Sequence, residues 1–288
     1  MKKLSTTVQL LLMLTFLVLW QAEAYAAPVI THVSDGQEVT LTQLMADAER
    51  SDLIMIGEVH DNKGHHEIQL AVIRSLWAKK LPLAIGVEMM QTDSQKDLDD
   101  WTEGKISERD FLTVFADNWT YHWQLYRDIF IFARDNKIPM VALNIPREVA
   151  KKVSRGGYKS LTAEEMKNLP AGTSCDLNNP HTAFLKKSFQ EVFKHVTNGR
   201  VFDYFCEAQT LRNSGMAMNI GQYAKKHPAR KIIALAGIWH SVRNAVPEQL
   251  ARNGSKLASM VILPEIPELQ RDNATPEEAD YMIGLSPS

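Results

Sequence analysis

The chain has 288 residues, of which 45% are hydrophobic, and it carries 34 acidic and 32 basic side chains. This composition is sufficient to bury one large core, or one core and a smaller satellite domain. A formal net charge of −2 argues against a nucleic-acid-binding surface, which needs an excess of Lys and Arg.

The N-terminal segment has the pattern of a secretory signal. Lys2 and Lys3 precede an apolar run over residues 8–20, and alanines follow at positions 22, 24, 26 and 27. A charged start, an apolar centre and small residues before a cleavage point are typical of such signals. The apolar run is shorter than the roughly 20 residues of a membrane-spanning helix. We therefore expect residues 1–26 to be removed as a signal peptide, leaving a periplasmic chain with no transmembrane span.

Four short apolar runs follow along the chain, and each ends in polar residues suited to metal binding or proton transfer. An amphipathic stretch follows each run, as is typical of parallel strands that helices cover on both faces. The sequence therefore predicts an α/β fold with a mostly parallel sheet, in which ligands bind at the carboxyl ends of the strands. The runs and their polar ends are 53–56 with Glu58 and His60, 83–87 with Glu88, 140–143 with Asn144 and Arg147, and 232–235 with His240.

Between the third and fourth runs the sequence predicts helices and no strand. Pro146 suits a first helical turn, Thr162 and Glu165 form a capping-box pattern, and apolar residues recur at helical spacing over 184–196. We expect residues 148–227 to form a small all-helical subdomain, inserted into an α/β domain made of residues 27–147 and 228–288.

Both cysteines, Cys175 and Cys206, lie in this predicted helical region. An even cysteine count permits a disulfide in an oxidising compartment. Alternatively, Cys206 is a small apolar residue buried on a helix. The sequence leaves both interpretations open.

The polar strand ends suggest a shared site. Glu58, His60, Glu88 and His240 would meet if their strands are neighbours, and two carboxylates with two imidazoles suit a divalent ion such as zinc, manganese or iron. A metal ion there would activate water for hydrolysis of an ester or amide. Alternatively, these residues cap helices or hydrogen-bond across strand ends. The neighbouring His65 and His66 are predicted to be solvated on a first helical turn.

Six motifs stand out along the chain: GEVHDNKGHH at 57–66, GVEMM at 86–90, WQLYRDIFIFAR at 123–134, ALNIPREV at 142–149, EAQTLR at 207–212, and AGIWH at 236–240 with VPEQL at 246–250. In their order and spacing they resemble the motifs of the ChaN family of haem-binding uptake proteins, and the similarity covers about residues 50–263. The sequence departs from the family pattern at Asn213, where an aspartate is usual, and at residues 243–245, where glycines are usual.

The resemblance implies an α/β domain with a small helical domain, and haem binding linked to haem or iron acquisition. It further implies a homodimer that encloses cofacial haems, with a tyrosine as the iron ligand. The family's superfamily also contains the Tiki metalloproteases and erythromycin esterases, which keeps a metal-dependent hydrolase as the alternative function. The shared motifs contain no such tyrosine, so the haem-binding candidates are chosen by their place in or beside the inserted helices: Tyr204 and Tyr158, with His181, His195, Lys186 and Lys187 as partners.

Overall fold

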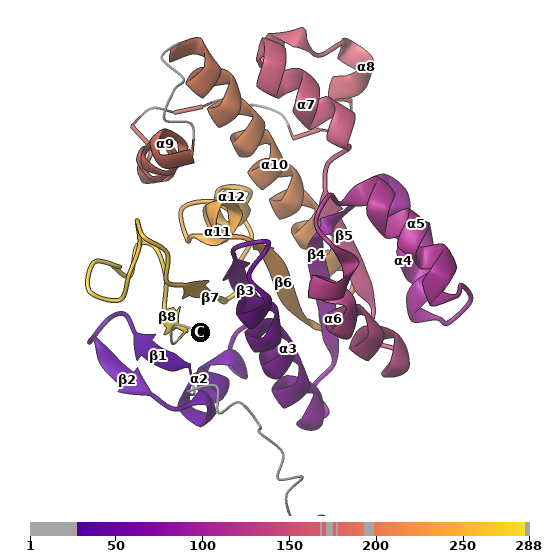
Figure 1. Cartoon of the computed structure of the whole chain (residues 1–288), viewed down its shortest axis with the longest axis vertical. Coiled ribbons are helices and arrows are strands. Elements are labelled where there is room, and N and C mark those ends of the chain that lie inside the picture. The colour runs from indigo at the N-terminus through magenta and orange to yellow at the C-terminus, as the bar shows by residue number, and fades with distance from the viewer. Residues whose placement is uncertain (1–27, 168, 171–174, 177, 193–198, 286–288) are drawn as a thin grey trace, which may run out of the picture.

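The computed structural model describes residues 28–167, 169–170, 175–176, 178–192 and 199–285 (Figure 1). The predicted signal peptide and His195 lie outside these residues. In chain order the elements are β1 (Val29–His32), β2 (Gln37–Val39), α2 (Leu41–Ala48), β3 (Leu53–Glu58), α3 (Lys63–Ala78), β4 (Leu83–Gln91), the 3₁₀ turn η1 (Thr92–Ser94), α4 (Gln95–Thr102), α5 (Glu108–Asn118), α6 (Trp123–Asp135), β5 (Met140–Asn144), α7 (Arg147–Gly156), the 3₁₀ turn η2 (Tyr158–Ser160), α8 (Ala163–Met166), α9 (Pro180–Val192), α10 (Gly199–Lys226), β6 (Lys231–Gly237), α11 (Ile238–Ser241), α12 (Val246–Arg252), β7 (Ser259–Pro264) and β8 (Tyr281–Gly284).

The strands form one eight-stranded sheet in the order β2-β1-β8-β7-β3-β6-β4-β5. The pairs from β8 to β5 are parallel, and β1 pairs antiparallel with both β2 and β8. All six residues of β3 are buried, because helices cover both faces of the sheet. The predicted α/β fold with a mostly parallel sheet is confirmed.

Alternate residues of the central strands supply two separate cores. Ile54 and Ile56 of β3 face one side, where they join a core with apolar residues of α3 and α6. Leu53 and Met55 face the other side, where they join a core with residues of α10 and α12. This alternation of strand side chains produces a three-layer arrangement and fixes the direction in which each strand-end residue points.

Helix α10 connects the helical segment to the sheet. Met216 and Ile220 in its second half belong to a sheet core, whereas Ala208 and Leu211 in its first half pack with Val153 of α7. Among the described residues between β5 and β6, all regular elements are helical. The limits of the predicted subdomain, residues 148–227, stay a prediction, because α10 takes part in the packing of both regions. None of the helices within the described ranges has the length and hydropathy needed to cross a membrane.

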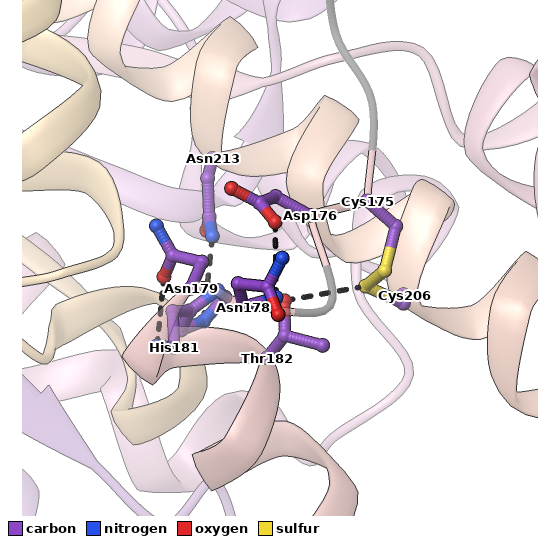
Figure 2. Close-up of a disulfide and its surroundings, with 8 residues drawn as sticks. All are labelled: Cys175, Asp176, Asn178, Asn179, His181, Thr182, Cys206 and Asn213. Atoms are coloured by element: carbon purple, nitrogen blue, oxygen red, sulfur yellow. Dashed lines mark hydrogen bonds between the residues drawn. A yellow bond between two sulfur atoms is a disulfide. The ribbon is translucent and has the colours of Figure 1, made fainter.

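Cys175 and Cys206 form a disulfide (Figure 2). The bond joins the segment before α9 to α10, and Cys206 is fully buried beside Phe189 and Phe202. This settles the alternative that the sequence left open.

Candidate functional site

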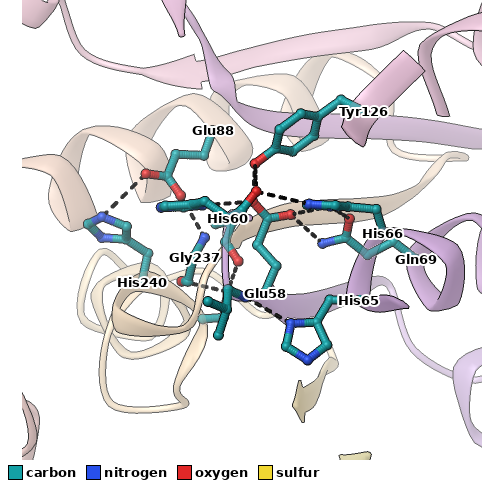
Figure 3. A network of polar contacts seen from close by, with 12 residues as sticks. Glu58, His60, His65, His66, Gln69, Glu88, Tyr126, Gly237 and His240 are labelled. Carbon is teal, nitrogen blue, oxygen red and sulfur yellow. Dashed lines mark hydrogen bonds and ion pairs between the residues drawn. The ribbon is translucent and has the colours of Figure 1, made fainter. Parts of the chain in front are cut away.

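The carboxyl ends of β3, β6 and β4 bring the strand-end polar residues together (Figure 3). Glu58 is the last residue of β3 and pairs in register with Gly237, the last residue of β6. Glu88 lies in β4, on the other side of β6, and His240 lies in α11 directly after β6. Both carboxylates are buried, at 1% exposure for Glu58 and 0% for Glu88.

Glu58 accepts hydrogen bonds on both of its oxygens. Its Oε1 accepts from His60 Nδ1 and from the Tyr126 hydroxyl, both at 2.8 Å. Its Oε2 accepts from Gln69 Nε2 at 2.9 Å and from His66 Nδ1 at 3.1 Å. Four donors therefore surround one buried carboxylate.

These contacts decide the charge of Glu58. Burial by itself would raise the pKa of the carboxyl, but the hydrogen bonds and positive charges of His60 and His66 outweigh burial and hold the pKa of Glu58 well below its usual value. In the same way, burial opposes protonation of the two imidazoles, yet their bonds to Glu58 raise the pKa of both His60 and His66. Glu58 is thus an ionised carboxylate, and its contacts favour the protonated form of both histidines.

Glu88 has a different set of partners. Its Oε2 accepts the backbone N–H of Gly237 at 2.7 Å, and its Oε1 pairs with the guanidinium of Arg212. The Nε2 of His240 lies 3.5 Å from the same Oε1. The Nδ1 of His240 donates to Asn213 Oδ1 at 2.5 Å. Burial, together with the charges of Arg212 and neighbouring histidines, lowers the pKa of His240 well below 6.5, so this imidazole is neutral.

The structure brings Glu58, His60, Glu88 and His240 into one polar cluster, but it does not arrange them as metal ligands. Across the described residues, no group of three or more His, Cys, Asp or Glu side chains has an arrangement suited to a metal ion. The physical reason is that the oxygens of Glu58 already accept four hydrogen bonds, and those of Glu88 are engaged by a guanidinium and a backbone N–H.

His65 and His66 are buried, at 5% and 2% exposure, so the expectation that they are solvated is wrong. The first turn of α3 packs against the end of β3. There, His65 Nδ1 accepts the N–H of Val59 at 3.0 Å and His66 Nε2 donates to the carbonyl of His60 at 3.2 Å. Burial lowers the pKa of His65 to about 4.

Tyr158 and Tyr204 lie at one junction, where η2 meets α10. The ring of Tyr204 covers Gly157, because a Cβ at this glycine would stand 2.8 Å from Tyr204 Cε1. The backbone N–H of Tyr158 donates to Glu207, and its hydroxyl donates to the carbonyl of Pro170 at 3.3 Å. Both tyrosines are half-buried. One turn before Tyr204, Val201 is an exposed apolar side chain.

The remaining haem-binding candidates are placed differently. His181 is buried and its Nε2 donates to the carbonyl of Trp239 at 2.7 Å, so protein encloses this imidazole. Burial lowers the pKa of His181 to about 4. Lys186 and Lys187 are exposed on α9, where Lys187 donates to the carbonyl of Glu268 at 3.0 Å.

Sequence reasoning missed several members of the cluster, namely Gln69, Tyr126, Arg212 and Asn213, all of which come from helices. Arg212 anchors Glu88 and also donates to Asn144 Oδ1 at 3.3 Å. The signal was present: Tyr126 and Arg212 fall in two of the motifs that carry the family resemblance.

Comparison with known proteins shows the fold and the family of the chain. One similar structure is described as cofacial heme binding to ChaN of Campylobacter jejuni. The match covers 90% of this chain and 97% of that chain, with a TM-score of 0.72 and 17% identity. It also resembles the type III effector HopBA1, with a TM-score of 0.50, 12% identity, and coverage of 85% of this chain and 92% of that one. At these identities the likeness concerns the fold alone.

A sequence relative is Protein RETICULATA-RELATED 5, chloroplastic, of Arabidopsis thaliana, which is 20% identical over 247 residues and 80% of this chain. The chain spans 33% of the length of that protein. A family model described as haem-binding uptake, Tiki superfamily, ChaN, matches residues 44–250. Because this match extends over well more than half of its residues, the chain belongs to the ChaN family of haem-binding uptake proteins.

Proposed function

We propose that this protein binds haem in the periplasm and serves haem or iron acquisition, with haem held where η2 meets the first half of α10. The observation that carries the proposal is that Tyr158 and Tyr204 both adjoin Gly157, one turn from the exposed apolar side chain of Val201, in a chain of this family. We call Tyr158, Val201 and Tyr204 the tyrosine surface.

The tyrosine surface has the chemistry that haem requires. A phenolate oxygen can serve as an axial ligand of haem iron. Contact between an exposed apolar side chain and the flat macrocycle removes apolar surface from water, which favours binding. Val201 of α10 is 40% exposed. Arg155 and Lys159, at the end of α7 and in η2, are exposed cations near Tyr158 in sequence that suit propionate groups. Bound haem would supply the iron, and the chain would supply ligand, apolar cover and charge.

Tyr204 is the favoured iron ligand of the two. The hydroxyl of Tyr158 already donates to the carbonyl of Pro170, and ligation would break this bond. Tyr204 extends instead from a regular helix one turn after Val201, so its ring and the apolar side chain share a helix face. A homodimer is proposed with the site, since a second copy would bury the far face of the macrocycle together with Val201.

Two observations support a periplasmic location. The pattern of residues 1–26 is that of a signal peptide, and the Cys175–Cys206 disulfide is typical of proteins in oxidising compartments. The alternative function, a metal-dependent hydrolase at Glu58, His60, Glu88 and His240, receives no matching support, because these side chains form no metal-ligand group within the described residues.

Haemin titration of the purified protein tests the proposal. We expect a saturable Soret band and a shift from monomer to dimer in size-exclusion chromatography. Tyr204→Phe should remove the phenolate-to-iron charge-transfer absorbance, whereas Tyr158→Phe should retain it. Tyr223→Phe is the matched control, because this residue lies in the same helix and its hydroxyl has no hydrogen-bond partner among the described residues. Absence of saturable binding by the wild-type protein contradicts the proposal.

A further inference from the structure

A cleft of about 350 Å³ opens at the carboxyl ends of β4 and β5, between α7 and α10. The tyrosine surface takes no part in its lining. The cleft adjoins the polar cluster through Arg212, whose guanidinium lines the cleft and pairs with Glu88 behind it. The polar side chains of the lining include Gln91, Asn144, Arg147, Lys151, Gln209 and Arg212.

The charge of the lining points to an anionic ligand. Arg147, Lys151 and Arg212 are cationic, and none of the described residues that line the cleft is an Asp or Glu, although Lys151 also pairs with Glu148 at 3.5 Å. The charge of Arg212 is partly balanced by Glu88, but its side chain remains 20% exposed. Among the described residues, its Nε is bonded to Asn144 and its Nη2 to Glu88. These two bonds hold the guanidinium fork in place, which reduces the entropy that a ligand must overcome.

A buried amide in the lining lacks a partner. Gln209 is 8% exposed, and its Oε1 has no hydrogen-bond partner within the described part of the chain. A buried acceptor without a donor is unfavourable, and such atoms in native proteins usually mark a missing partner. Gln209 lines the cleft, and because the terminal torsion of glutamine is soft, a rotation about it would turn Oε1 toward a bound ligand. A ligand with an O–H donor would therefore satisfy it.

The anion that fits best is a carboxylate. A planar carboxylate matches the guanidinium fork. Phosphate is typically bound by free backbone N–H groups at a helix start, but here the N–H of Arg147, the first residue of α7, already donates to Gln91 Oε1 at 2.6 Å.

We infer that this cleft binds a small hydroxycarboxylate, with its carboxylate on Arg212 and Arg147 and its hydroxyl donating to Gln209. The volume lies at the lower end of the roughly 300 to 1,000 Å³ range of small-molecule sites. The cleft and the proposed haem site have no residue in common.

Isothermal titration calorimetry with three matched pairs of acids tests the inference: citrate and tricarballylate, malate and succinate, and lactate and propionate. Each pair differs only in the hydroxyl. We expect at least one hydroxy acid to bind with 1:1 stoichiometry and about tenfold or more tightly than its partner, because a site built around a hydroxyl discriminates strongly against the analogue that lacks it.

Variants assign the preference to the named groups. Gln209→Leu should abolish the difference within the pair, and Arg147→Gln should weaken both members about equally. Lys225→Gln, an exposed cation in the last turn of α10, is the control that should change neither. Gln209→Met, which keeps the length of the side chain but not the acceptor, replaces Gln209→Leu if that variant fails to fold.

Three results overturn the inference. They are the absence of a hydroxyl preference in all three pairs, a preference that persists when Gln209 is replaced, and inorganic phosphate that binds as tightly as the best hydroxy acid. Haemin titration of the same Gln209 variant separates the two sites. An unchanged Soret band with altered acid binding is the expected result, so failure of one proposal does not imply failure of the other.

Discussion

The buried ring of His240 has an uncharged hydrogen-bond partner, Asn213, at its Nδ1. Asn213 accepts a hydrogen bond from Nδ1 of this buried imidazole, and an amide has no charge with which to stabilise an imidazolium. Burial and the guanidinium of Arg212 therefore keep the pKa of His240 low. The pair of Asn213 and His240 therefore carries no net charge in this chain.

Asn213→Asp should raise the pKa of His240, because a carboxylate next to Nδ1 favours the protonated ring. An NMR titration of the histidine Cε1–H resonances would measure the change. Asn273→Asp, on the exposed segment before β8, serves as control. If the resonance of His240 titrates at the same pH in the wild type and in Asn213→Asp, the prediction is wrong, and burial and Arg212 outweigh the carboxylate introduced at position 213.

Gly237 gives His60 the room to reach Glu58. A Cβ at position 237 would stand 2.6 Å from Cε1 and 2.9 Å from Nε2 of His60. Gly237→Ala should displace the ring, lower the free energy of unfolding by about 1 to 3 kcal/mol, and bring the pKa of His60 back toward its usual value, because the bond to Glu58 raises it. Urea denaturation and NMR titration measure the two effects.

Gly221→Ala is the matched control for this variant. Gly221 lies inside α10, and the nearest atom to a Cβ there is 3.6 Å away. Since alanine favours a helix by about 1 kcal/mol over glycine, this variant should be stabilised. Equal stability of Gly237→Ala and the wild type would contradict the proposed steric role of Gly237.

The site could be predicted from the sequence only where its residues follow strands. Glu58 and Glu88 were found because the carboxyl ends of parallel strands meet at one edge. His66 was misjudged, because its sequence position on a first helical turn does not reveal that the turn packs against β3. Which side of a helix faces the site depends on tertiary packing, so the sequence does not predict that Tyr126 and Asn213 belong to the polar cluster.

At the scale of elements, the Cys175–Cys206 disulfide joins the segment before α9 to α10 across a sequence separation of 31 residues. Closing a loop of this length contributes about 3 to 4 kcal/mol on the chain-entropy model. Replacing both cysteines by alanine should therefore lower the melting temperature, and hydrogen exchange should increase in α9 and the first half of α10.

In the variant without the disulfide, the amides of β3 and β6 should still exchange only through global unfolding, because the sheet cores do not include the disulfide. Adding a reductant to the wild-type protein is the companion measurement and should reproduce the loss of thermal stability. An unchanged melting temperature in both experiments would contradict a stabilising role for the bond.

Element boundaries were predicted less well than element types. The apolar run at 83–87 predicts a strand that ends before Glu88, yet β4 continues to Gln91. The pairing of β4 with β5 shifts register between Val87 and Gln91, and a bulge of this kind redirects side chains near sites. Strands that are buried on both faces have no alternation of polar residues, so the sequence gives no sign of a register shift.

At the scale of the whole molecule, the order of strands determines which distant residues meet. The sequence predicts parallel strands but not that β6 lies between β3 and β4. This order places Gly237 between Glu58 and Glu88, and it brings together residues more than a hundred positions apart. Strand order arises from long-range packing, which local patterns do not encode.

Buried neutral histidines should make the whole fold sensitive to acid. The folded-state pKa of His181 is lowered to about 4, from 6.5. Between these values the unfolded chain takes up a proton that the folded chain excludes. The stability due to this residue is therefore complete above pH 6.5 and is lost as the pH falls toward 4. The pKa of His65 is also lowered to about 4, so this residue too reduces the free energy of unfolding as the pH falls. His60 and His66 oppose it, since the stability due to their raised pKa values is present at low pH and is lost as the pH rises.

Comparison of the wild type with His181→Gln isolates this effect, because glutamine can donate to the carbonyl of Trp239 but does not titrate. Between pH 7.5 and pH 4.5 the free energy of unfolding should fall by about 2 to 3 kcal/mol more in the wild type than in the variant. Urea denaturation at both pH values measures the difference, and His122→Gln, at an exposed position, provides the control. Parallel pH dependence in the wild type and His181→Gln would show that His181 takes up its proton without loss of the fold, and that the acid sensitivity has its origin in other groups.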